Sequence, residues 1–361
     1  MTILRGVGKG QASAYNRTMK ITLIDDSIHF DALMPTTRPL GGAEKAFAAL
    51  PGALVRAGHR VTAINHAHAD MTIEGAKWRT WDSRRDHRAD VLIAYRKPTL
   101  LGALRGARRR LLWVTAHPRY LETPATSALL RSFEARLLFV SQAQRALYQG
   151  PQPAFVLEPG ARFDYLREAE MTPESPPRAV VTTHPLHGLD WLIGLWRTRI
   201  RPACPGAELH VYSATLLRAL AGEAVAAEMR PIADMVMDAR GDGVFARKPD
   251  GDMYMADDYL KARVHLYPGQ AEDWGCWTLA ETQAMGLPAV VRPLGAAAER
   301  LVEGKTGFVA KNDDDFVRQT LQILNQDEVF KSLSAAARTY GRARTWDAAA
   351  LSLTAWLENE R

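Results

Sequence analysis

Two carboxylates in the second half of the chain are placed to bind a ligand. Asp273 and Glu281 lie eight residues apart, and the glycine-containing turn between them leads into a predicted helix. Backbone N–H groups at a helix start can hold an anion, while carboxylates accept hydrogen bonds from hydroxyl groups. This combination suits a ligand that carries both phosphates and hydroxyls, such as a nucleotide sugar. The alternative for Glu281 is an acid that only stabilises the helix dipole.

The segment 273–288 resembles the paired-acid signature of the retaining glycosyltransferases of family four, which have the two-domain GT-B fold. Asp273 stands where that family usually has glutamate, and the Ala-Met-Gly-Leu-Pro run after Glu281 fits the family pattern. The resemblance implies that Asp273 lies near the hydroxyls of the transferred sugar and that Glu281 receives the ribose hydroxyls. Glu272 is a rival for the first role, but the spacing favours Asp273. We include Glu272, Gly275 and Cys276 in the predicted donor-binding set.

Two features of the first half fit the same family. Gly41 and Gly42 precede a predicted helix and resemble the first glycine-rich loop, where backbone N–H groups approach a ligand closely. His117 follows a predicted strand, at the sheet edge where ligands of open α/β sheets bind. The resemblance implies that His117 contacts the donor sugar; the alternative is a histidine that satisfies local backbone groups. Pro51-Gly52 should kink or shorten the helix after the loop.

The diphosphate-binding segment departs from the family. The family usually has an arginine and then a lysine before a glycine, whereas here His187 takes the lysine place and no arginine precedes it. Histidine is a pH-dependent cation, because its unperturbed pKa lies near about 6.5. Arg247 and Lys248 could enter the cleft and compensate, or could be exposed loop cations. Gly295 resembles part of a later loop that contacts the diphosphate, whereas Glu299 in that loop is left open between a cap and a ligand.

We predict neither a metal site nor a cofactor. The segment 250–252 reads Asp-Gly-Asp, a pattern that binds divalent metals in another glycosyltransferase fold, but its turn context explains these residue types. Cys204 and Cys276 are far apart and favour neither a disulfide framework nor a zinc site, so a reducing cytoplasm fits best. A dinucleotide-dependent oxidoreductase is disfavoured, because no Gly-x-Gly-x-x-Gly follows the first predicted strand.

Strand-like apolar runs alternate with helical stretches, which predicts an α/β protein with two Rossmann-like halves. The predicted strands are 21–24, 60–64, 91–95, 111–115 and 137–140 in the first half, and 178–183, 209–212, 264–267, 289–291 and 307–310 in the second. We expect a disordered extension over 1–18, an acceptor domain over 19–171, a linker over 172–177, a donor domain over 178–344 and a helix over 345–361 that crosses back to the first domain.

The charge is unevenly distributed along the chain. Residues 1–170 contain 25 Lys and Arg against 15 Asp and Glu, whereas the remainder contains 21 against 25. A basic first domain could attract an anionic membrane surface from the cytoplasmic side, or could simply be solvated loops and helix ends. Nucleic acid is disfavoured because no recognisable binding module accompanies the charge. No apolar run approaches the roughly 20 residues that span a bilayer.

These patterns together predict a retaining, metal-independent hexosyltransferase. Its substrates would be a nucleoside diphosphate sugar and a glycan or lipid-linked acceptor, in polysaccharide or cell-envelope glycan biosynthesis. The alternative from another class is a protein of the same fold that binds a nucleotide sugar or glycan without transferring it. The histidine at position 187 is the main argument for this alternative.

Overall fold

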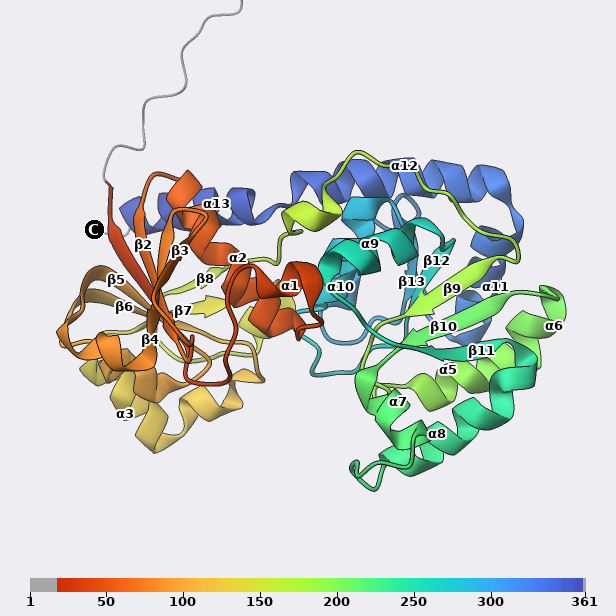
Figure 1. Cartoon of the computed structure of the whole chain (residues 1–361), viewed down its shortest axis with the longest axis horizontal. Coiled ribbons are helices and arrows are strands. Elements are labelled where there is room, and N and C mark those ends of the chain that lie inside the picture. Colours follow the sequence, from red (N-terminus) through yellow and green to blue (C-terminus); the bar gives the residue numbers. More distant parts are fainter. Residues whose placement is uncertain (1–17, 360–361) are drawn as a thin grey trace, which may run out of the picture.

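The computed structural model describes residues 18–359, apart from the side chains of Arg85 and Asp86. The predicted disordered extension thus lies outside the described residues except for Thr18. The chain forms two lobes, each built on one sheet with helices packed against it (Figure 1). We call the lobe of the first sheet the first domain and the lobe of the second sheet the second domain. The predicted α/β class with two parallel sheets is confirmed.

The first sheet has the order β3-β4-β2-β1-β5-β6-β7-β8, and all its neighbours are parallel except β3 and β4. Its strands are β1 (Lys20–Ile24), β2 (Arg60–Asn65), β3 (Met71–Ile73), β4 (Ala76–Thr80), β5 (Arg88–Tyr95), β6 (Gly106–Trp113), β7 (Arg136–Phe139) and β8 (Ala154–Val156). The second sheet has the order β11-β10-β9-β12-β13-β14. Its strands are β9 (Arg178–Val181), β10 (Glu208–Tyr212), β11 (Val244–Arg247), β12 (Val264–Tyr267), β13 (Ala289–Val291) and β14 (Gly307–Val309).

Helices connect these strands. The first domain contains α1 (Met34–Thr37), α2 (Gly42–Arg56), α3 (Pro124–Ser132) and α4 (Gln142–Ala146), with the 3₁₀ helices η1 (Trp81–Asp86), η2 (Pro98–Gly102) and η3 (Pro118–Glu122). The crossover to the second domain carries η4 (Phe163–Tyr165). The later helices are α5 (Leu189–Leu195), η5 (Trp196–Ile200), α6 (Arg201–Ala203), α7 (Ala214–Leu220), α8 (Met229–Asp238), η6 (Ala239–Asp242), α9 (Asp252–Leu260), α10 (Trp277–Met285), η7 (Ala297–Arg300), α11 (Asp313–Asn325), α12 (Asp327–Ala343) and α13 (Trp346–Asn359).

The ten predicted strands are all present, with small shifts at their ends. Four further strands were not predicted, namely β3, β4, β8 and β11. Each is only three to five residues long, and β4 alternates the buried Ala76 and Trp78 with the outward Lys77 and Arg79. Such short or half-polar segments give a weak periodic signal.

The helix after the glycine pair was expected to be kinked or shortened at Pro51-Gly52, and the expected shortening is wrong. α2 continues through both residues as a single helix from Gly42 to Arg56. Proline removes one helical hydrogen bond, but Pro51 is buried and its neighbours Leu50 and Ala53 belong to the core of the first domain. Nine consecutive residues of α2, 46–54, are buried, and burial of this apolar face outweighs the local cost.

Two apolar layers lie on the faces of the first sheet. One packs β1, β2 and β5 against α2 and α13, and includes Phe47, Trp113 and Trp346. The other lies under η2 and α3 and includes Ile24, Ile64 and Leu92. α13 follows α12 and packs on α2, so the C-terminal segment lies on the first domain (Figure 1). Within residues 18–359, none of the helices combines the length and the hydropathy that a membrane span requires.

Candidate active site

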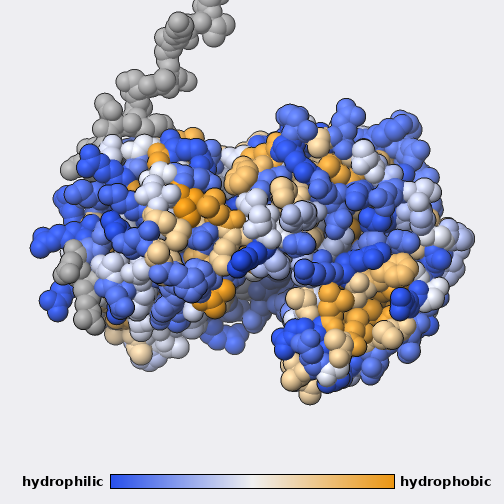
Figure 2. All heavy atoms as spheres, in the orientation of Figure 1, coloured by the Kyte–Doolittle hydropathy of each residue, from blue (hydrophilic) through white to orange (hydrophobic). Residues whose placement is uncertain are grey.

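The carboxyl ends of the central strands of both sheets meet where the domains touch. His117 follows β6, and its ring lies edge-on to the ring of Trp274, which follows β12, with 5.8 Å between the centroids. The carboxylate of Glu299 accepts hydrogen bonds from the N–H groups of Gln142 (2.9 Å) and Ala143 (2.5 Å) at the first turn of α4. Glu299 is thus a cap that joins the domains. Figure 2 shows the two lobes in contact above a notch that separates them.

A buried cluster of charged groups crosses the domain junction. Lys45, in the first turn of α2, places its Nζ 2.5 Å from Oε1 of Glu281 on α10 and 2.7 Å from Oδ1 of Asp252 on α9. Arg162 donates from Nε to the other oxygen of Asp252 at 2.8 Å, and the Tyr165 hydroxyl donates to Oδ1 at 2.8 Å. The lysine of the first domain therefore holds two carboxylates of the second.

The electrostatics of this cluster favour a charged lysine. The side chains of Lys45, Asp252 and Glu281 are only 11%, 2% and 7% exposed. Burial alone would lower the pKa of Lys45, but the adjacent carboxylates of Glu281 and Asp252 outweigh it, and the pKa is raised. Oε1 of Glu281 is thereby fixed, whereas its Oε2 is buried and has no hydrogen-bond donor among the described residues. A hydroxyl-bearing ligand would supply that donor.

Asp273 organises the turn that leads into α10. Its Oδ2 accepts a hydrogen bond from the Tyr267 hydroxyl at 2.5 Å, and its Oδ1 accepts one from the backbone N–H of Cys276 at 3.0 Å. Its backbone oxygen accepts from Ala296 N at 2.9 Å, directly after Gly295. Asp273 therefore shapes the loop that would face a ligand, and each carboxylate oxygen keeps a further lone pair for a sugar hydroxyl.

Arg300 holds the same turn through hydrogen bonds from its guanidinium. It is 2% exposed and donates to the backbone oxygens of Gly275 (3.2 Å), Trp274 (3.2 Å) and Val140 (2.8 Å). Cys276 is buried and has a left-handed backbone conformation, with φ 44°. Gly275 and Cys276 thus hold the backbone geometry of the turn, and Glu272 beside them is exposed.

A chain of hydrogen bonds ties the start of α10 to the end of β9. Thr182 Oγ1 donates to Thr278 Oγ1 at 2.7 Å and lies 2.9 Å from Nε2 of His265. The other ring nitrogen of His265 lies 2.9 Å from Thr282 Oγ1. Complete burial lowers the pKa of His265 to about 3, so its ring is neutral. The segment after β9 and the helix that carries Glu281 are therefore held in one arrangement.

The segment after β9 contains His187, which the sequence analysis aligned with the lysine of the family pattern. Burial lowers the pKa of His187, the neighbouring His184 lowers it further, and Asp273 opposes the shift. His187 is thus uncharged at neutral pH in the free protein. Gly188 follows with φ 83°, a conformation that glycine adopts without strain, and begins the helical stretch 189–203.

Arg292 is a cation near this turn that the sequence analysis did not single out. It directly follows β13, and its guanidinium lies beside Gly188. A Cβ atom placed on Gly188 would be only 3.3 Å from Nη1 of Arg292. Its guanidinium stacks over the ring of Trp191, 4.4 Å from the centroid, which fixes its direction. Arg292 therefore lies beside the turn where the family places its diphosphate cations.

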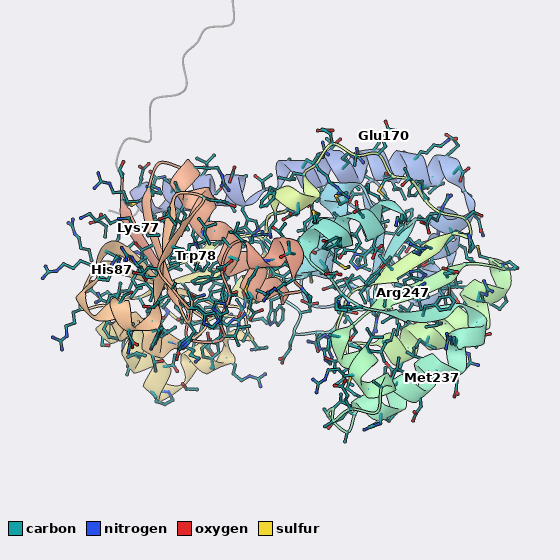
Figure 3. All side chains as sticks on the ribbon, viewed as in Figure 1. Lys77, Trp78, His87, Glu170, Met237 and Arg247 are labelled. Carbon is teal, nitrogen blue, oxygen red and sulfur yellow. The ribbon has the colours of Figure 1, made fainter. Side chains whose placement is uncertain are left out.

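The other predicted cations lie further away along the sheet. Arg247 ends β11, the outermost strand of the second sheet, and its guanidinium lies against His210, with Nε 3.3 Å from Nδ1 (Figure 3). Lys248 is exposed next to it. Neither makes a contact with Asp273, Glu281 or Arg292 among the described residues. They lie at the carboxyl end of β11, which is the edge strand of the second sheet.

The glycine pair brings the first domain close to α10. A Cβ atom at Gly42 would lie 2.4 Å from Cδ1 of Trp277, so only glycine permits this approach. Gly41 caps α2 by accepting the N–H of Lys45 at 2.9 Å. Glu44, between them, pairs with Arg96 at 2.6 Å. The loop therefore places Lys45 beside Glu281, a contact across the domain junction that the sequence analysis did not predict.

The structure thus joins His117, Gly42, Asp273 and Glu281 along one junction, adds Lys45 and Arg292, and leaves Arg247 and Lys248 at its margin. The described residues contain no cluster of three or more histidine, cysteine, aspartate or glutamate side chains suited to a metal. In the Asp-Gly-Asp segment, Asp252 is bound by Lys45 and Arg162, and Asp250 accepts the N–H of Gly251. These two acids therefore serve structural contacts.

No protein-family model matches the chain, and no curated protein matches it either. Solved structures do. Sucrose-phosphate synthase from Thermosynechococcus elongatus has 14% identity and a TM-score of 0.71, over 95% of this chain and 99% of that one. WaaG, a glycosyltransferase involved in lipopolysaccharide biosynthesis, has 14% identity and a TM-score of 0.63, over 92% and 98%.

HepE from Anabaena, solved with UDP and glucose, has 14% identity and a TM-score of 0.63, over 95% of this chain and 100% of that one. At these identities the similarity establishes the fold. The chain therefore has the two-domain GT-B architecture, as its sequence pattern predicted.

Proposed function

We propose that this protein is a retaining glycosyltransferase that moves a hexose from a nucleoside diphosphate sugar to a hydroxyl of a glycan or lipid-linked acceptor. The proposal rests on the two carboxylate oxygens of Glu281. Lys45 fixes one of its carboxylate oxygens, and the other is buried at the domain junction without a hydrogen-bond donor from residues 18–359. A buried acceptor left unpaired costs roughly 1–3 kcal/mol, and a ribose hydroxyl of the donor would remove that cost.

Arg292 and the turn at Gly188 would hold the diphosphate. The guanidinium offers paired N–H donors to phosphate oxygens, and backbone N–H groups of the first turn after Gly188 would add to them. His187 would add a proton-dependent contribution, because bound phosphates raise the pKa of a neighbouring imidazole. Arg292 and His187 would together take the place of the arginine and the lysine that the family pattern has in this segment. Lys45 is a positioning residue, since it orients Glu281 from the opposite domain.

The chemistry would rest on positioning and charge stabilisation. His117 and Asp273 would orient the sugar, and the acceptor hydroxyl would attack its anomeric carbon from the leaving-group face. The bond from that carbon to the diphosphate oxygen breaks, the new glycosidic bond forms, and the hydroxyl proton passes to the departing diphosphate. We assign no nucleophile of the protein and no metal, so turnover should persist in EDTA.

Two further features support the choice of substrates and compartment. The neighbour HepE was solved with UDP and glucose, which supports a UDP-sugar as the first donor to test. Cys204 and Cys276 are buried free thiols, which fits a reducing compartment. We therefore propose a cytoplasmic reaction, in the synthesis of a polysaccharide or cell-envelope glycan.

The test is a donor panel on the wild type, Glu281→Gln and the surface control Glu328→Gln. UDP-, GDP- and ADP-glucose are screened by thermal shift, and release of nucleoside diphosphate is then measured with and without glycan acceptors. We expect one donor to stabilise the wild type and the control, to lose this effect with Glu281→Gln, and to be turned over. No stabilisation by any donor would refute the proposed donor site.

A second candidate function is binding without transfer. The observation that favours it is the neutral His187 at the place of the family lysine, since a weaker phosphate clamp would slow departure of the diphosphate. Donor binding that depends on Glu281 but yields no nucleoside diphosphate with any acceptor would establish this candidate. Donor-dependent product would exclude it.

A further inference from the structure

A cavity lies at the amino ends of β1, β2, β4 and β5, at the edge of the first sheet opposite to the candidate active site. Its volume is about 740 Å³. Volumes of about 300–1,000 Å³ are typical of sites for small molecules. Figure 3 shows Lys77 and His87, which line it, on the side of the first domain that faces away from the second.

The strand register places a row of cations on one face of the sheet here. Lys20 pairs with Arg60, and two residues further along Thr22 pairs with Thr62, which pairs with Lys77. Because side chains two residues apart lie on the same face, all five share the face that lines the cavity. The two threonines are only 1% and 8% exposed, so they form the floor, and the exposed cations form the rim.

The connection from β4 to β5 leaves this face open. A crossover between parallel strands usually carries a helix that covers the sheet. Here the connection consists of the six-residue 3₁₀ helix η1 followed by His87. The apolar half of the face, nearer the carboxyl ends, is covered by η2 and α3, whereas its amino half stays polar.

The cations of the cavity are largely uncompensated. Within residues 18–359, the side chains of Lys20, Arg60 and Lys77 form no ion pair with a carboxylate, and nor does that of Arg88. Two acids near these strands already have partners. Asp70 pairs with Arg79, and Asp90 accepts the backbone N–H of Lys20 at 2.8 Å.

His87 lies inside this positive field. Its Nε2 is 2.9 Å from the Thr22 hydroxyl. Burial lowers its pKa, and Arg79, Lys20 and Lys77 lower it further, which shows that these cations converge on the same space. An anion in that space would meet hydroxyl donors at the floor and cationic donors at the rim.

We propose that this cavity binds a soluble, phosphate-bearing metabolite, at a site separate from the donor site. Phosphate oxygens match the lysine, arginine and threonine donors that converge there. A membrane surface is the weaker alternative, because the threonine floor lies recessed beneath the cations. The first 17 residues do not offer the anion either, since their sequence contains three cationic side chains and no acid.

The experiment uses the full chain and inorganic tripolyphosphate as the probe. Affinity is measured by calorimetry for the wild type and for the double variant Arg60→Gln/Lys77→Gln. The matched control is Arg240→Gln/Lys305→Gln, which removes two exposed cations of the second domain. A third variant, Arg292→Gln, removes the proposed donor-site cation. We expect the first pair of substitutions to weaken binding by about tenfold or more, because two charge-assisted contacts are lost, while the control and Arg292→Gln retain it.

Hydrogen exchange locates the bound probe. Protection by tripolyphosphate of residues 20–22, 60–62 and 77–88 is expected in the wild type and lost in the double variant. Unchanged affinity in the double variant, or protection only around residues 187–190, would overturn the proposal. Phosphatidylglycerol vesicles form the second arm. Binding to vesicles that depends on Arg60 and Lys77, without binding of tripolyphosphate, would also overturn it in favour of a lipid surface.

Discussion

Replacing Lys45 by methionine removes the cation that the first domain places between two buried carboxylates of the second. Asp252 keeps Arg162 as a partner at 2.8 Å, so the uncompensated charge falls mainly on Glu281. Breaking one buried pair in this way typically costs about 3–5 kcal/mol. We expect a loss of stability of that size, because the three side chains are at most 11% exposed and water cannot replace the ammonium group.

The pH dependence of this variant has a definite sign. Burial already raises the pKa of the Glu281 carboxyl in the folded wild type, and Lys45 opposes that shift. Removing Lys45 therefore raises the pKa further, so folding of the variant takes up a proton over a wider pH range. The stability of the variant therefore falls as the pH rises, and its deficit against the wild type should be larger near about pH 8 than near about pH 5.5. The double variant Lys45→Met/Glu281→Gln removes both charges and should recover part of the loss.

The assay is urea unfolding followed by tryptophan fluorescence at both pH values. The control is Lys97→Met, which breaks the exposed pair with Asp26 (3.1 Å, with side chains 51% and 36% exposed) and should cost less than about 1 kcal/mol. A Lys45→Met variant within about 1 kcal/mol of the wild type at both pH values would refute the assignment of a buried, charged cluster.

Three further predictions concern the donor site and the domain junction. Arg292→Gln should weaken donor affinity about tenfold with little change in stability, measured by calorimetry against Arg240→Gln, because a phosphate contact is lost; equal effects of both substitutions would contradict its role. Donor affinity of the wild type should rise as the pH falls from neutral into the acidic range, because burial lowers the pKa of His187 and bound phosphate favours its protonated form; His187→Gln should abolish this rise, and a rise that persists in the variant would show that another group causes it. Trp274→Ala should cost about 3–5 kcal/mol in urea unfolding, because the ring is 6% exposed in the core of the first domain; a cost below that of Lys97→Met would show that the junction is loosely packed.

The sequence predicted the fold because the relevant signals are local. The apolar runs of β1, β9, β12 and β13 are short, continuous and bounded by polar or glycine-containing segments, which is typical of buried parallel strands. The wrong expectation for α2 came from treating Pro51 as a local breaker, whereas the helix is stabilised by burial against distant strands.

The site was predicted only in part, because its key contacts join residues far apart in the sequence. Glu281 and Asp273 were proposed from their spacing, from the turn between them and from the family resemblance. Lys45 is paired with a carboxylate 236 residues away, and no local pattern marks that contact. Arg292 carries no motif, although its place directly after β13 puts it at the sheet edge where ligands bind.

The charge count of the first half did not show which of its cations are available to a ligand. It did not distinguish Arg110, which donates to the backbone oxygens of Leu101, Leu104 and Ala107, from Lys77, which lines an open cavity. Arg84 similarly donates to the Trp81 carbonyl and stacks on its ring. The basic first domain is therefore less of a continuous charged face than its composition indicates.

The most direct test of the proposed donor site is a crystal structure of the protein with a UDP-sugar bound. The account predicts a ribose hydroxyl within hydrogen-bond distance of Oε2 of Glu281, with the diphosphate against Arg292 and the N–H groups after Gly188. A donor bound elsewhere, with Oε2 of Glu281 still unpaired, would contradict the central claim.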